Sequence, residues 1–177
     1  MRSSADAYLD IETTGLSAFF DYITVVGILR CDGGKDELVQ LVGKDVTRGN
    51  LITALRNVKN IYTYNGERFD LRFISNALGI DLSAHYAHRD LMYDCWRCNL
   101  YGGFKAVERQ LGISRRLVGV NGYAAVQLWW SYVKGGNERA LATLLEYNKE
   151  DVVNLKALKE KLSSVGQTAD LRARYSM

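Results

Sequence analysis

Four acidic side chains stand out because each occupies a position where the local pattern favours a buried apolar residue. They are Asp10, Glu12, Asp70 and Asp151. A carboxylate inside a protein core is costly unless a cation or hydrogen bonds compensate its charge. Ligation by several carboxylates is typical of Mg²⁺ and Mn²⁺, and two such ions about 3.5–4 Å apart are the standard arrangement for phosphodiester hydrolysis. The set therefore predicts a site for two divalent ions, Mg²⁺ or Mn²⁺, that acts on phosphate.

Asp10 and Glu12 lie on and just beyond a strand predicted at residues 7–11. Side chains two residues apart on a strand point to the same face, so both carboxylates share one face. A half-exposed strand with a polar face produces the same alternation. This pair alone leaves both interpretations open.

Asp70 lies on the buried side of a helix predicted at about residues 68–78, which Gly79 ends. With Phe69 at zero and about 100° added per residue, Ile74 falls near 140° and Asp70 near 100°. Asp70 is therefore inside the apolar arc, where a buried acid needs a partner.

Asp151 lies in the same kind of place on the last predicted helix. With Leu141 at zero, the apolar arc runs from about 260° to about 40°, and Asp151 falls near 280°. Tyr147 is four residues earlier, on the same side of the helix. The alternative interpretation of Asp151 is a buried salt bridge, to Arg109 or Arg116.

The elements that must position these acids follow an order typical of α/β proteins. Strands are predicted at residues 7–11, 23–29, 37–42, 60–64 and 88–91, and helices at 48–58, 68–78, 92–99, 103–111, 122–134 and 138–162. Hairpin-connected strands come first, strands that alternate with helices follow, and helices end the chain. The order predicts one mixed five-stranded sheet flanked by helices, an α/β domain over residues 1–162 with a polar C-terminal tail at 163–177.

The composition limits the class of protein. The chain has 177 residues, of which 47% are hydrophobic and 24% charged, as in a soluble single domain. No segment approaches the roughly 18 apolar residues of a membrane helix, and the start lacks the apolar stretch of a signal peptide. We therefore expect a cytoplasmic protein without a membrane partner. The net charge is +3, and neutralising the four acids with metal leaves a basic surface that suits a polyanion.

The acidic motifs together resemble those of the DEDD exonuclease superfamily, which has the ribonuclease-H-like fold. Its first motif, D-x-E-T-T-G-L, is similar to residues 10–16, and its second, N-G-x-x-F-D, to residues 65–70. Its third motif, tyrosine four residues before aspartate, is similar to residues 147–151. Position 146 is glutamate where the DEDDh branch has histidine, so the chain resembles the DEDDy branch. Residues 88–91 are similar to the H-x-D-L strand of the stand-alone prokaryotic YprB-like subgroup.

This resemblance implies a metal-dependent 3′→5′ exonuclease that acts on single-stranded DNA or RNA with a free 3′ end. Asp10 would bridge both ions, and Glu12 and Asp151 would hold the ion that activates water. Asp70 would help to hold the other ion. Tyr147 would orient the water through its hydroxyl, because a phenol with a pKa near 10 is a poor base at neutral pH.

Substrate contacts follow from the same resemblance. Thr13 would bind the terminal nucleotide, and Leu16 would wedge against its base, although a single leucine is as often a core residue. Asn65 would contact substrate or steady the site. The candidate phosphate contacts are Arg68, Arg72, Arg115, Arg116 and Lys149, although a solvated surface charge is the commoner role for any single one of them. Base stacking is open to Tyr101, Tyr123, Trp129, Trp130 and Tyr132, but for those in helix 122–134 we favour the core. Asp90 is expected to cap the end of a strand.

Other functions remain open at this point. A non-catalytic nucleic-acid-binding domain would keep the fold but lose an acid, and none of the four is lost. An endonuclease or a nucleotide phosphohydrolase is the third class, because one fold hosts several activities. Without an additional domain, we expect specificity to come from a small surface or from a protein partner.

Overall fold

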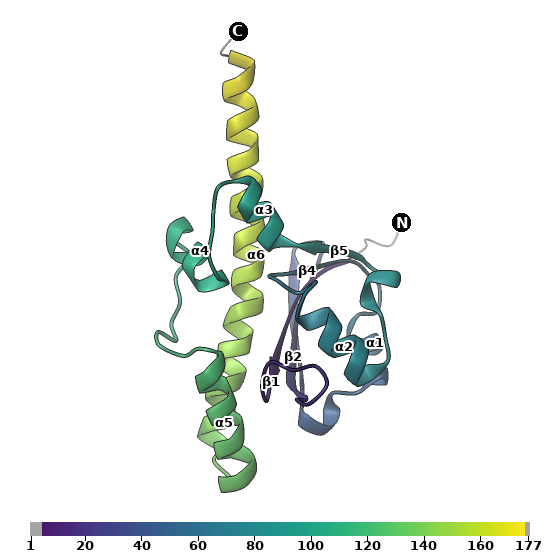
Figure 1. Ribbon diagram of the computed structural model, residues 1–177. Coiled ribbons are helices and arrows are strands. Elements are labelled where there is room, and N and C mark those ends of the chain that lie inside the picture. The colour runs from purple at the N-terminus through teal and green to yellow at the C-terminus, as the bar shows by residue number, and fades with distance from the viewer. Residues whose placement is uncertain (1–4, 176–177) are drawn as a thin grey trace.

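Five strands form one mixed sheet in the order β3-β2-β1-β4-β5, as the computed structural model shows (Figure 1). The structure describes residues 5–175, with side chains through residue 164. The strands are β1 (Ala5–Thr13), β2 (Ile23–Asp32), β3 (Lys35–Val42), β4 (Val58–Thr63) and β5 (Ala87–Asp90). β1 is central: it pairs antiparallel with β2 and parallel with β4. The predicted mixed five-stranded sheet is confirmed.

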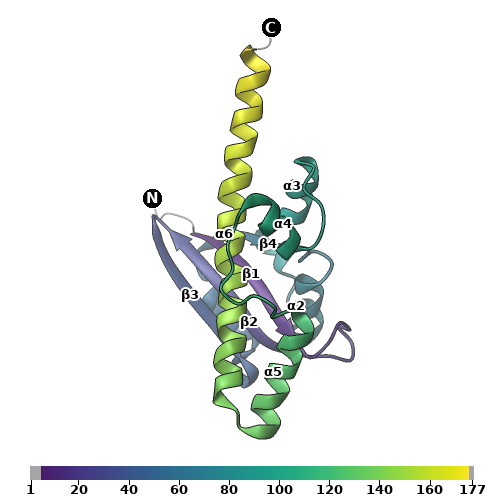
Figure 2. The ribbon, with the colours of Figure 1, turned by 90° about the vertical axis from the view of Figure 1, so that its left-hand side faces the viewer.

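Helices cover both faces of this sheet (Figures 1 and 2). They are α1 (Arg48–Ala54), α2 (Asp70–Leu78), α3 (Leu91–Arg97), α4 (Phe104–Leu111), α5 (Gly122–Gly135) and α6 (Glu138–Tyr175), with short 3₁₀ turns at Gly43–Asp45 and Leu82–Ala84. α1 and α2 pack on one face, whereas α6 crosses the other with α3, α4 and α5 around it. None of the helices in the described residues has the length and apolar character needed to cross a bilayer.

The alternation along β1 decides which way its acids point. Leu9 and Ile11 belong to the core beneath α1 and α2. Tyr8 belongs to the core on the opposite face, beneath α6. Asp10 and Glu12 therefore face α6, and the prediction that they share a face is confirmed.

Several of the predicted boundaries are wrong. α6 continues to Tyr175 instead of ending near residue 162. The polar composition after that position suggested an irregular end, but polar residues such as Gln and Arg propagate a helix well. α1 ends at Ala54 and β4 begins at Val58, two residues before the predicted strand. The division into a domain at 1–162 and a tail at 163–177 stays a prediction.

Gly66→Ala tests the loop between β4 and α2, which sets the position of Asp70. A Cβ at Gly66 would lie 2.3 Å from the Oγ1 of the fully buried Thr63. We expect a loss of about 1–3 kcal/mol in the free energy of unfolding, because neither side chain nor backbone can move away cheaply. The control is Gly49→Ala on α1, where a Cβ meets no atom within 4 Å and should stabilise by up to about 1 kcal/mol. Urea unfolding measures both, and equal stabilities would contradict the assignment.

Candidate active site

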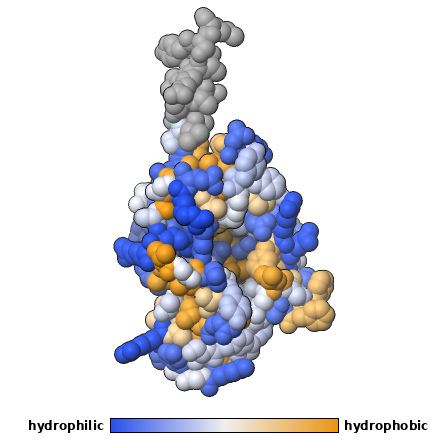
Figure 3. Space-filling view, turned by 60° about the vertical axis from the view of Figure 1, so that its left-hand side comes forward, coloured by the Kyte–Doolittle hydropathy of each residue, from blue (hydrophilic) through white to orange (hydrophobic). Residues whose placement is uncertain are grey.

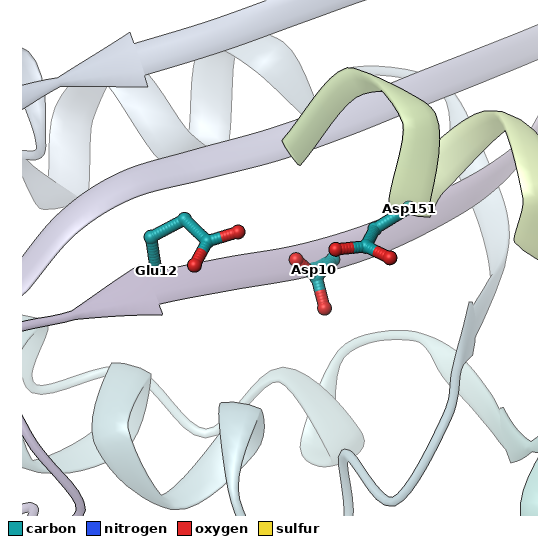
Figure 4. A group of neighbouring side chains, drawn as sticks. All are labelled: Asp10, Glu12 and Asp151. Atoms are coloured by element: carbon teal, nitrogen blue, oxygen red, sulfur yellow. The ribbon is translucent and has the colours of Figure 1, made fainter. Parts of the chain in front are cut away.

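Three of the four acids meet where α6 crosses the middle strand of the sheet. Asp10 and Glu12 come from β1 and Asp151 from α6, and one oxygen of each lies within 4.8 Å of the others. Figure 4 shows the Asp10 and Asp151 carboxylates side by side, with that of Glu12 directed toward them. Glu12 and Asp151 are buried, and Asp10 is half-buried. These are carboxylates from distant parts of the chain gathered at one point.

Asp70 approaches the same point from the other side of β1. It is the first residue of α2, it is buried, and its Oδ1 accepts a hydrogen bond from the Ile11 N–H at 3.1 Å. Ile11 lies beyond Tyr8, the last residue of β1 that pairs with β4, so this amide needs a partner other than a strand. Asp70 is thus fixed next to the two β1 acids but outside the group of three oxygens that lie within 4.8 Å of one another.

The electrostatics of the cluster favour a cation. Burial, and then the negative charge of Asp151, raise the pKa of Asp10 and of Glu12 well above the usual range. Burial raises the pKa of Asp70 to about 7. The Oε1 atom of Glu12 is buried and has no hydrogen-bond partner among the described residues. An all-carboxylate set with an orphaned oxygen fits a divalent cation such as Mg²⁺ or Mn²⁺.

Arg115 is a cation that the fold itself brings to Asp151. Its Nη2 donates to Asp151 Oδ1, and its Nε donates to Glu108 Oε2 at 2.5 Å. The side chain is only 10% exposed, and its guanidinium lies over the Phe104 ring, 5.5 Å from the centroid. Burial raises the pKa of Asp151, and Arg115 counteracts that rise.

The buried salt bridge considered for Asp151 is therefore present, but with a different arginine. The expected partners were Arg109 and Arg116, and the observed partner is Arg115. Arg115 was also a candidate phosphate contact, whereas here its guanidinium binds carboxylates. The segment that carries it, between α4 and α5, has no helical or strand periodicity from which its contacts could be read.

Asn148 is a second support that the sequence interpretation missed. It is fully buried, donates from Nδ2 to Asp10 Oδ2 at 3.1 Å and accepts from Gln40 Nε2 at 3.0 Å. Gly27 is the partner of Asp10 in β2, and a Cβ there would lie 2.1 Å from Asn148 Oδ1. Only glycine leaves room for this amide. The signal was available, because Asn148 falls at about 340° on the helix, inside the apolar arc.

Tyr147 lies one turn before Asp151 and borders the acids. Its side chain is buried, and Lys105 Nζ lies over its ring, 4.5 Å from the centroid. Burial, followed by the charge of Asp151, raises the pKa of Tyr147 above its ordinary value. The phenol therefore keeps its proton at neutral pH and can donate a hydrogen bond, but it cannot serve as a base.

Two cavities meet over the acids and share Asp10, Gly122, Tyr147 and Asp151. The first, here called the apolar arm, has a volume of about 550 Å³ and is lined mainly by residues of β1, the β1–β2 loop and α5. The second, the basic arm, has a volume of about 480 Å³ and is lined by Lys105 and Arg109 of α4, with Tyr64 and Phe104. The arms together can seat an elongated ligand that passes over the carboxylates.

The predicted substrate residues divide between the cavity and its surroundings. Thr13 and Leu16 line the apolar arm, and Leu16 is 87% exposed, so it is not a core residue. Asn65 and Arg68 line neither arm. Asp90, for which a cap at the end of a strand is predicted, is the last residue of β5 and caps the N-terminus of α3; its carboxylate also accepts the Asn65 N–H at 2.8 Å, which holds the loop before Asp70.

The aromatic residues of α5 correct another expectation. Trp129 is buried, as predicted for this helix. Tyr123 is 75% exposed and lines the apolar arm, so its assignment to the core is wrong. Tyr123 occupies the first turn of α5 and lies at the cavity instead of in the core. Lys105 and Arg109 were missed as a pair, although their four-residue spacing places both on one face of α4.

The chain belongs to the RNase_H superfamily, because the model of that family matches residues 7–163. No curated protein gives a significant match to the sequence. Among solved structures, one described as the apo form of the nuclease is similar with a TM-score of 0.58 and 20% identity, over 90% of this chain and 72% of that one.

Brucella melitensis NrnC bound to pGG is similar with a TM-score of 0.57 and 21% identity, over 97% of this chain and 79% of NrnC. The same protein with bound Mg²⁺ gives a TM-score of 0.54 and 20% identity, over 97% and 80% of the two chains. At sequence identities this low, the structural similarity shows a shared fold and nothing further.

Metal-free protein should lose stability as the pH rises. The pKa of Asp70 goes from 3.8 to about 7 on folding, so the folded state binds more protons between these values, and stability falls as the pH rises through that window. We expect the Tm in EDTA to decrease from about pH 5 to about pH 8, and Mn²⁺ to restore it most at the higher pH.

Asp10→Asn tests whether the pH dependence of the Tm comes from repulsion within the acidic cluster or from acids elsewhere in the protein. Removing one charge should raise the metal-free Tm at about pH 8 and reduce the Mn²⁺-induced shift, because the cluster then repels less and binds less. Asp81→Asn changes a fully exposed acid and should leave the Mn²⁺ shift unaltered. Thermal unfolding with and without Mn²⁺ measures all three proteins, and a pH-independent wild-type Tm would contradict the electrostatic account.

Proposed function

We propose that this chain is a DEDDy-type 3′→5′ exonuclease of the YprB-like subgroup that hydrolyses single-stranded DNA or RNA with two divalent ions. The observation that carries the proposal is the gathering of Asp10, Glu12 and Asp151 within 4.8 Å at the junction of the two arms. Tyr147 beside them distinguishes the DEDDy branch. All four acids are retained, which disfavours a non-catalytic domain.

The residues present fit a divalent cation, and Mg²⁺ bound to NrnC, a protein of the same fold, supports this choice. Asp10, Glu12 and Asp151 would hold the cations together with Asp70. When bound, such ions activate water and stabilise the charge on the attacking and leaving oxygens.

The chain's own residues keep the carboxylates in place for that chemistry. Asn148 holds one oxygen of Asp10, and the Ile11 amide holds one oxygen of Asp70. Arg115 takes one oxygen of Asp151 and leaves the other available. The Tyr147 hydroxyl, still protonated, would donate a hydrogen bond that orients the attacking water.

The two arms suit the two chemical parts of a nucleotide chain, the anionic backbone and the apolar faces of the bases. Lys105 and Arg109 in the basic arm would attract the phosphodiester backbone. Leu16 and Tyr123 in the apolar arm would contact the bases. NrnC bound to pGG supports a nucleic-acid substrate for this chain as well.

A 5′-labelled single-stranded oligonucleotide tests the polarity directly. With Mn²⁺ or Mg²⁺ we expect progressive shortening from the 3′ end, a stop on addition of EDTA, and resistance of oligonucleotides with blocked 3′ ends. DNA and RNA are compared side by side on denaturing gels. Asp10→Ala and Asp151→Ala should each lower the rate by about 10³-fold or more while the circular dichroism spectrum is retained. Internal cuts alone, or full activity of either variant, would contradict the proposal.

Tyr147→Phe removes only the hydroxyl that the proposal assigns to water positioning. The turnover rate should fall about 10–100-fold, because the water loses its hydrogen bond. The Mn²⁺ affinity, measured by calorimetry, should change less than about twofold, since the phenol is not a ligand. Tyr101→Phe, whose hydroxyl lines neither arm, is the control. An unchanged rate in Tyr147→Phe would remove the assigned role.

A further inference from the structure

We propose that Phe19 and Phe20, on the loop between β1 and β2, form a shelf on which bases of a single strand stack beyond the nucleotides held in the cavity. The inference rests on the proposed function and narrows its substrate: a strand of several nucleotides is bound better than a dinucleotide. These two residues are called the phenylalanine shelf below.

The exposure of the shelf is the first observation. Phe19 is 85% exposed and Phe20 is 92% exposed. Two adjacent aromatic side chains in water, in a protein whose other phenylalanines are at least partly buried, indicate a surface that binds something. Figure 2 shows the loop between β1 and β2 projecting away from the sheet, and Figure 3 shows hydrophobic residues at the surface of the molecule, among them a group that projects at the right-hand margin.

The loop that carries the shelf is held in one conformation by its own hydrogen bonds. The Asp21 carboxylate accepts the Ser17 N–H at 2.9 Å and the Thr14 hydroxyl at 3.2 Å, and the Thr14 N–H donates to the Tyr22 carbonyl at 3.0 Å. A Cβ at Gly15 would lie 2.5 Å from Asp21 Oδ2, so glycine allows this closure. A preorganised aromatic surface loses little entropy on binding.

The shelf is carried by the same loop that lines the apolar arm. Thr14, Gly15 and Leu16 of the same loop line that arm, and Tyr123 of α5, 75% exposed, lines it as well. The apolar arm begins at the acids, and residues 14–16 of the loop form one of its borders. Phe19 and Phe20 follow a few residues later on the same loop. A strand that has its end over the acids and follows this loop out of the arm would therefore meet two further aromatic faces.

Single-stranded nucleic acid suits these features better than the other occupants. Aromatic faces stack bases of any sequence, and cations such as Lys105 and Arg109 at the other arm attract the backbone. The loop from Thr13 to Tyr22 has no Lys or Arg, so contact there is with the uncharged bases, and the cations that attract the backbone are those of the basic arm. Two phenylalanines alone bury too little area for a stable dimer.

The test compares strand lengths in the double variant Phe19→Ala/Phe20→Ala. Binding of a 5′-fluorescein (dT)₁₂ and (rU)₁₂, followed by anisotropy with Ca²⁺ in place of Mg²⁺, should weaken about tenfold. Hydrolysis of the dinucleotides pTpT and pUpU should change less than about twofold. The double variant Phe19→Tyr/Phe20→Tyr keeps the aromatic faces and should restore the 12-mer affinity, and Trp96→Ala, a partly exposed aromatic residue that lines neither arm, should have no effect.

Unchanged 12-mer binding in the alanine variant, or equal losses for 12-mers and dinucleotides, would overturn the shelf. A concentration-dependent wild-type dimer that the alanine variant abolishes, seen by light scattering, would also overturn it in favour of a second copy. Shelf-dependent 12-mer binding without hydrolysis of any oligonucleotide would support the shelf and contradict the nuclease proposal, so the two failures are distinguishable.

Discussion

The concentration of negative charge at the crossing of β1 and α6 is the constraint on which the rest of the site depends. Two unit charges 4.8 Å apart, the upper limit for the oxygens of this group, repel by about 3.5 kcal/mol at an effective dielectric constant near 20, and burial adds a further cost. The chain supplies partial compensation at three of the four acids: an amide for Asp10, a backbone N–H for Asp70 and a guanidinium for Asp151. None of these neutralises Glu12, whose Oε1 is left without a partner.

Each compensating group must come within hydrogen-bond distance of its carboxylate. This requirement explains two local features of the fold. Gly27 faces Asp10 because any side chain there would displace Asn148. β1 extends beyond the last residue that pairs with β4, so the Ile11 N–H is free to donate to Asp70. The middle strand is therefore both the centre of the sheet and the support of the site, and the helix that covers it must carry polar residues at its crossing point.

Periodicity made much of this predictable from sequence. Burial follows the repeat of a helix or strand. An acid inside an apolar arc, such as Asp70 or Asp151, can therefore be recognised from the sequence as buried. Asn148 satisfied the same criterion and was overlooked because it is uncharged. Arg115 and Tyr123 were beyond such reasoning. The first lies in an irregular segment, and the second lies at a helix end where a repeat cannot tell whether a neighbour covers it.

Arg115 also shows why the cluster is poised for a cation rather than satisfied without one. A lone arginine beside Asp151 would neutralise it, but this guanidinium is shared with the buried Glu108 and approaches Glu150 at 3.9 Å. Three acids thus divide one positive charge, and the pKa of Asp151 remains raised despite the contact. Because Glu108 anchors the guanidinium, Asp151 stays oriented by one oxygen while its remaining negative charge faces Asp10 and Glu12. The fold thereby fixes the geometry of the carboxylates but leaves part of their negative charge uncompensated. A bound cation would neutralise that remaining charge.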